Sequence, residues 1–139
     1  MSLSLKLFFV AFFAFIVADS IWIGFVMKKF YIEQLAAIGR ITEGKFEPVL
    51  WSALVVYLIL ALGVVLFVFP KIGPETTFVS TFINGALLGL AIYGTYDFTN
   101  YTTLASWSLT ITFVDALWGM FVTGLVSVVT HYVSTILNS

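Results

Sequence analysis

The chain has 139 residues, of which 61% are hydrophobic and 9% charged, whereas a typical soluble domain is roughly 45–50% apolar and about 25% charged. Six basic and seven acidic residues leave a net charge of −1, so the chain lacks the basic face that neutralises a nucleic-acid backbone. The absence of cysteine excludes disulfides, thiolate catalysis and thiolate metal sites. This composition predicts a single transmembrane domain over residues 1–139.

Four apolar runs are each long enough to cross about 30 Å of hydrocarbon as a helix. They occupy residues 7–27, 49–69, 76–96 and 109–129. The second run contains no charged residue, while the third and fourth contain Thr, Ser, Asn and Gly, which favour packing against other helices. We therefore predict an all-α integral membrane bundle of four transmembrane helices with short connections.

The longest connection, residues 28–48, is called loop one here. Within it, Tyr31, Leu35 and Ile38 recur at helical spacing before Gly39, a residue that commonly ends helices. This pattern predicts a short interfacial helix between transmembrane helices 1 and 2.

The distribution of basic residues predicts the orientation of the bundle. Loop one contains four of the six basic residues, and the side with both termini contains the other two, Lys6 and Lys71. Because basic loops stay preferentially in the cytoplasm, we predict a multi-pass protein of the bacterial inner membrane with loop one in the cytoplasm.

Three aspartates occupy positions in or beside the apolar runs, where a carboxylate costs about 2.5–3.5 kcal/mol on insertion scales. Asp19 lies eight residues before Met27, roughly 12 Å deep, and Asp115 lies six residues beyond Leu109, roughly 9 Å deep. Asp97 follows the end of the third run, on the same side of the membrane. We therefore predict that the three carboxyl groups share one leaflet and line a polar pocket that opens toward loop one.

Two of these aspartates share a local pattern. The segments ADSIW (residues 18–22) and VDALW (residues 114–118) both read apolar, Asp, small, aliphatic, Trp. Residues three apart share a helix face, so we expect each carboxyl to lie beside the indole of its own helix, Trp22 or Trp118. Because these helices run in opposite directions, the pattern indicates an antiparallel duplication.

The third run contributes further polar groups, because Tyr93, Asp97 and Asn100 share a face if the helix continues past Tyr96. We expect five aromatic and amide side chains to form the pocket walls and bind substrate: Trp22, Tyr93, Tyr96, Asn100 and Trp118.

Small residues also recur four apart in the third and fourth runs. Such ridges let helix backbones approach closely, so we interpret them as packing surfaces. Their members are Thr81, Gly85, Gly89, Gly119, Thr123 and Ser127.

The segment YGTYDFTNYTTL (residues 93–104), followed by Trp107-Ser108 and VDALWG (residues 114–119), resembles the signature of domain-of-unknown-function family 2177. The resemblance covers essentially the whole chain and implies a small bacterial membrane protein with four spans. It transfers no catalytic roles. Members of that family are often encoded near lipid-modifying enzymes, so the resemblance favours lipid chemistry.

The available side chains limit the chemistry. The one histidine, His131, lies sixteen residues past Asp115, roughly 24 Å along a helix. That separation excludes a Ser-His-Asp triad and a His-Asp metal centre with these aspartates, and we expect His131 to be interfacial. No metal site is predicted, and the pattern identifies no cofactor.

Two interpretations of the aspartates remain open. They could lock helix register through hydrogen bonds, or they could form a catalytic acid/base or proton-sharing group in a low-dielectric pocket. The functional interpretation favours binding or modification of a membrane lipid or isoprenoid, with the aromatic rings flanking a developing cation. Proton- or cation-coupled transport by an oligomer, or a non-catalytic accessory role in a larger membrane complex, are the alternatives.

Overall fold

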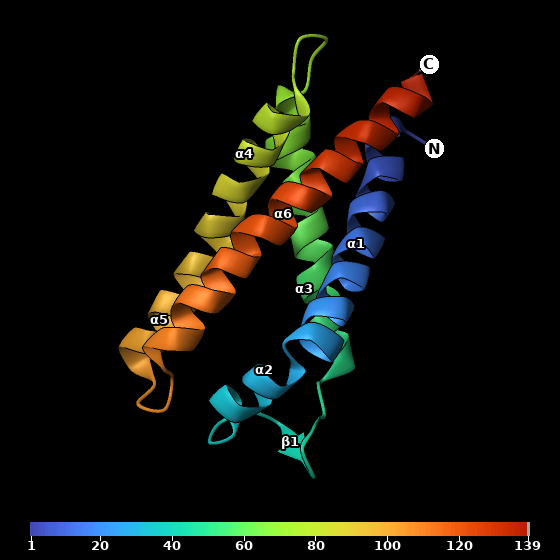
Figure 1. Cartoon of the computed structure of the whole chain (residues 1–139). Helices are drawn as coiled ribbons and strands as arrows, with labels where there is room; N and C mark the ends of the chain where they lie inside the picture. The colour runs from blue at the N-terminus through green and yellow to red at the C-terminus, as the bar shows by residue number, and fades with distance from the viewer. Residues whose placement is uncertain (139) are drawn as a thin grey trace.

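The computed structural model describes residues 1–138, and within them four helices are long and apolar enough to cross a membrane (Figure 1). These helices span Leu3–Val26, Leu50–Lys71, Phe78–Thr103 and Leu109–Asn138. The predicted all-α membrane bundle is confirmed, including the short helix α2 (Lys28–Leu35) between the first two spans.

Three of the four spans change helical geometry along their length. Span one combines α1 (Leu3–Ile21) with a π-helical turn, η1 (Trp22–Val26). Span two consists of α3 (Leu50–Gly63), the π-helical turn η2 (Val64–Val68) and the 3₁₀ turn η3 (Phe69–Lys71). Span three consists of α4 (Phe78–Gly89), the π-helical turn η4 (Leu90–Gly94) and α5 (Thr95–Thr103). Span four is the single helix α6 (Leu109–Asn138). Because π turns are rare and are frequent at functional sites, η1 and η4 are candidate parts of a functional site.

The third span continues seven residues beyond Tyr96, where the apolar run ended. Its last turns are polar, but Thr102 and Thr103 donate their hydroxyls to the carbonyls of Phe98 and Thr99, at 2.8 and 2.9 Å. These hydroxyls therefore have acceptors within their own helix, and Asp97 and Asn100 both lie in α5.

Loop one contains a feature that the hydropathy pattern did not reveal, a two-stranded hairpin of β1 (Ile41–Thr42) and β2 (Lys45–Phe46). Its two turn residues, Glu43 and Gly44, have positive φ angles of 49° and 72°, as in the tightest hairpin turns. Two residues per strand are too few to show an alternating pattern in the sequence. Gly44 is the one residue whose type could have indicated the hairpin turn.

Helices α4 and α6 pack along the small-residue ridges. A Cβ atom on Gly89 would overlap the carbonyl oxygen of Gly119, and one on Gly85 would overlap the Ser127 hydroxyl. These glycines therefore permit backbone contact, the usual device where no hydrophobic effect drives helices together.

The apolar core fills the bundle from its middle toward the termini. Its members come from α1, α3, η2 and α6 and include Phe15, Leu60, Val64, Val122 and Val126. At the opposite end, the α1–α3 pair and the α5–α6 pair diverge, and α2 with the hairpin lies below them (Figure 1). Both termini lie away from α2 (Figure 1), so the candidate site belongs to the loop-one end.

Candidate functional site

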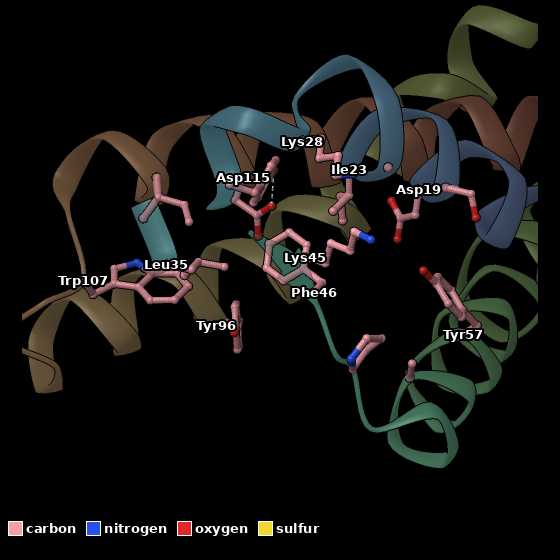
Figure 2. A pocket seen from close by; sticks show the side chains of 16 residues that line it. Asp19, Ile23, Lys28, Leu35, Lys45, Phe46, Tyr57, Tyr96, Trp107 and Asp115 are labelled. Atoms are coloured by element: carbon pink, nitrogen blue, oxygen red, sulfur yellow. Dashed lines mark hydrogen bonds between the residues drawn. The ribbon is translucent and has the colours of Figure 1, made fainter. Parts of the chain in front are cut away.

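A cavity of about 640 Å³ lies at the loop-one end, and we call it the loop-one cavity. Its walls come from seven helices and strands and the connections between them, and include Asp19, Tyr57, Tyr96, Trp107 and Asp115. Lys28 of α2 and Lys45 of β2 also line it. Figure 2 shows Asp19 and Tyr57 on one wall, Asp115 on another, and Lys45 extending inward from the hairpin.

A second cavity of about 420 Å³ lies between α3 and the η4–α5 segment, and we call it the lateral slot. It shares four lining residues with the loop-one cavity: Asp19, Ile23, Tyr96 and Asp115. Its outer wall includes Val56 and Ile59, which are 51% and 59% exposed on the apolar surface of the bundle. The two spaces therefore meet at the carboxyl groups.

Asp19 is buried in α1, with 7% of its surface exposed. The indole Nε1 of Trp118 donates a hydrogen bond of 2.8 Å to its Oδ1. The hydroxyl of Tyr57, on α3, faces the same carboxyl (Figure 2). Donors from two other helices thus orient this side chain.

Two hydrogen bonds in series connect Asp115 to the tryptophan of the other motif. The Tyr31 hydroxyl donates to Asp115 Oδ1 at 2.5 Å, and Trp22 Nε1 donates to the Tyr31 oxygen at 3.2 Å. Each aspartate is therefore linked to the tryptophan of the other motif, whereas the sequence pattern had suggested the tryptophan of its own helix.

The crossed pairing has a geometric cause. Trp22 and Trp118 stack in parallel, with ring centroids 4.4 Å apart and planes inclined by 2°. The stack brings the two indoles together between α1 and α6, where Trp118 Nε1 reaches Asp19 on α1 and Trp22 Nε1 reaches Tyr31 on α2. The two links differ, because Trp118 binds Asp19 directly and Trp22 reaches Asp115 through Tyr31.

Tyr31 lies outside the membrane spans, on α2. Burial raises the pKa of its hydroxyl well above the ordinary value, and the neighbouring charge of Asp115 raises this pKa further. The Tyr31 hydroxyl therefore keeps its proton and remains a donor throughout the physiological pH range.

Asp97 lies beside Asp115 and not on a cavity wall. Its surface is completely buried, and within residues 1–138 no N–H or hydroxyl group donates to either carboxyl oxygen. The Asp115 carboxyl is its polar neighbour. The three aspartates thus form a close pair, Asp97 and Asp115, and a separate carboxyl, Asp19, that shares the cavities with Asp115 alone.

The other predicted wall residues divide into two groups. Tyr96 lines both cavities, while Tyr93 and Trp118 line the lateral slot. Trp22 lies behind the wall, stacked on Trp118, and Asn100 neighbours the hydroxyl of Tyr96 without lining either cavity. The two π turns η1 and η4 contain Trp22 and Tyr93 respectively, so the altered helical geometry coincides with the site.

Sequence reasoning did not select Tyr31, Tyr57, Lys28, Lys45 or Trp107 as site residues. The spacing of Tyr31 in the sequence predicts a short helix, but no local sequence feature shows that α2 folds back over the bundle. The Ser108 hydroxyl, which caps α6 by accepting from Ile111 N at 3.1 Å, also donates to the Gln34 side chain and ties α2 to the start of α6.

His131 lies far from the carboxyl groups, on the terminal half of α6. Its side chain is buried between helices, where its Nδ1 is 2.8 Å from the Thr81 hydroxyl and its ring packs on Phe78. In the part of the chain that the structure describes, no three His, Asp or Glu side chains are grouped as a metal site.

These observations define a multi-pass membrane protein of four helices with a buried carboxyl–aromatic network at one end. Residues 4–132 match the family described as "Predicted membrane protein (DUF2177)", and the chain belongs to this family. Neither the comparison with curated proteins nor the comparison with solved structures gives a match.

Proposed function

We propose that the loop-one cavity and the lateral slot bind one membrane lipid or isoprenoid, and that the buried carboxyls act on it as acid/base or proton-sharing groups. The observation that carries this proposal is the junction of the two cavities at Asp19 and Asp115. One cavity faces the membrane surface and the other faces the bilayer, which is the arrangement that a molecule with a polar head and an apolar chain requires.

The composition of the walls supports an amphiphilic ligand. Val56, Ile59 and Leu60 form the α3 side of the lateral slot and suit a hydrocarbon chain. Asp19, Tyr57 and Asp115 concentrate the polar atoms where the slot joins the loop-one cavity.

The paired carboxyls supply the chemical part of the proposal. Asp97 and Asp115 can hydrogen-bond to each other if they share one proton. In that state Asp115, which lines the cavity, can deliver the shared proton to a ligand, which leaves both carboxyls ionised until the pair takes up another proton. Asp19, held by Trp118, is then the acceptor on the facing wall.

The packed terminal half of the bundle favours this one-sided pocket over transport. Phe15, Val122 and Val126 are fully or almost fully buried between the carboxyls and the terminal side. A proton- or cation-coupled transporter needs a path through that region, which an oligomer or a moving helix would have to provide. An accessory role in a larger membrane complex would instead place a protein segment in the lateral slot.

We also propose that the protein resides in the bacterial inner membrane with loop one in the cytoplasm. The basis is the count of basic residues, four in loop one against two on the terminal side. The cavity would then receive its ligand from the cytoplasmic leaflet.

Photocrosslinking tests whether a lipid chain occupies the site. The full-length protein is reconstituted with phospholipids whose acyl chain carries a diazirine, and crosslinks are mapped by mass spectrometry. We expect crosslinks at Ile23, which lines both cavities. Val56→Trp should fill the lateral slot and reduce these crosslinks several-fold.

The matched control is Val55→Trp, at a neighbouring position that is 42% exposed and lines neither cavity. It should leave the Ile23 crosslinks unchanged. Equal crosslinking of Ile23 in the two variants, or none in the unaltered protein, contradicts the proposed lipid pocket. Crosslinks from Ile23 to another protein in native membranes would support the accessory role.

A further inference from the structure

Two lysines stand at the mouth of the loop-one cavity. Lys28 begins α2 directly after span one, and Lys45 belongs to the hairpin. The three glutamates of loop one lie outside the cavity lining, and one of them, Glu33, is paired with Lys29 at 3.8 Å. No glutamate therefore lines the cavity beside the two lysines, and the acidic side chains of its lining are Asp19 and Asp115.

Lys28 and Asp19 lie at different depths. Lys28 follows the last residue of span one by two positions, which places it at the level of lipid phosphates. Asp19 lies nine residues earlier, roughly 13 Å deeper along the helix. An anionic group at the mouth is thus separated from the carboxyls, which face the part of a lipid below its headgroup.

Trp107 adds an unused hydrogen-bond donor to the same wall. Its side chain lines the cavity and is 7% exposed, and within residues 1–138 its indole N–H has no acceptor. A buried donor without a partner is costly, whereas the oxygen atoms of a phosphate or an ester would satisfy it. The wall therefore favours a ligand rich in acceptors.

We infer that the loop-one cavity selects an anionic phospholipid, with its phosphate between Lys28 and Lys45 and its ester region toward Asp19 and Asp115. One acyl chain leaves through the lateral slot. This inference rests on the lipid pocket proposed above and adds the headgroup class. It assigns a lipid and not a soluble phosphate compound, because the basic mouth continues into an apolar slot that opens to the bilayer.

The experiment compares lipid retention by the full-length protein. The protein is incubated with equal amounts of phosphatidylglycerol and phosphatidylethanolamine in detergent, and bound lipids are quantified by native mass spectrometry. We expect a preference for phosphatidylglycerol that falls about tenfold in the Lys28→Gln/Lys45→Gln variant. The control variant, Lys29→Gln/Lys71→Gln, loses the same charge from positions outside both cavities and should keep the preference.

The outcomes separate this inference from the proposed function. Retention of lipid with the same preference in both variants overturns the headgroup assignment and leaves the lipid pocket standing. Absence of retained lipid in the unaltered protein overturns both. Displacement of the lipid by an equal concentration of glycerol 1-phosphate overturns the assignment to a lipid, because a soluble compound would then bind as well.

Discussion

Asp19 and Asp115 each accept a hydrogen bond from an aromatic donor, Trp118 in one case and Tyr31 in the other. Interhelical hydrogen bonds of this kind contribute about 0.6–1.7 kcal/mol in membranes, so they help to fix helix register. Both carboxyls nevertheless face open cavities, which packing alone does not need. The structural and the chemical roles are therefore compatible at the same residues.

Replacement of the carboxyls by amides separates these two roles. An Asn side chain at position 19 or 115 keeps an oxygen that accepts from Trp118 or Tyr31, but it cannot exchange a proton. If the carboxyls perform acid/base chemistry, Asp19→Asn and Asp115→Asn should lower the activity at least about a hundredfold while the protein stays folded. The measurement is the lipid composition of cells that produce each variant, by mass spectrometry.

The control for this experiment is Glu75→Gln, a neutralised carboxylate in the turn before α4, outside both cavities. Lipid changes that occur with the unaltered protein should persist in this variant. If they also persist in both Asn variants, with normal thermal unfolding in detergent, the carboxyls serve structure alone.

At the scale of the elements, the contact between α4 and α6 positions the site. Gly89 meets the backbone of Gly119, and one turn further along the same span Tyr93 lies over Gly119. The closeness of the two helices thus sets the position of Tyr93 on the lateral slot and of Trp118 beneath the Trp22 ring.

Gly89→Ala should therefore destabilise the bundle by about 1–3 kcal/mol, because the added methyl group overlaps a backbone atom that cannot move alone. The midpoint of thermal or SDS-induced unfolding measures the effect. Gly63→Ala is the matched control, since a Cβ there would make an ordinary contact of 3.5 Å with Leu88. Equal midpoints for the two variants would show that α4 and α6 do not depend on this contact.

On the scale of the whole molecule, the bundle is asymmetric along the membrane normal. The terminal half is filled by the apolar core, and the loop-one half diverges around the cavities (Figure 1). Orientation therefore decides which compartment the loop-one half faces.

We expect loop one to lie in the cytoplasm, because it carries four of the six basic residues. The chain has no cysteine, so single Glu43→Cys and Glu75→Cys variants report on the two sides without background. An impermeant maleimide added to intact spheroplasts should label the cysteine at position 75 and leave position 43 unlabelled. Labelling at position 43 alone would reverse the orientation and place the cavity outside.

The amino-acid sequence by itself determined the membrane class, the four apolar helices and the position of Asp19, Asp97 and Asp115 toward one end of the bundle. These properties follow from hydropathy, helical rise and residue counts, which are local quantities. Hydropathy did not locate the end of the third span, because the polar residues of α5 stay helical as far as Thr103.

Only the tertiary structure decided which groups surround the carboxyls. The donors to Asp19 and Asp115 lie 99 and 84 residues away in the chain, and their choice depends on how α1 crosses α6 and how α2 folds beneath both. Lys45 reaches the cavity through a hairpin of two residue pairs, too short to carry a pattern. Side-chain partners of this kind are set by packing between helices, which no local periodicity encodes.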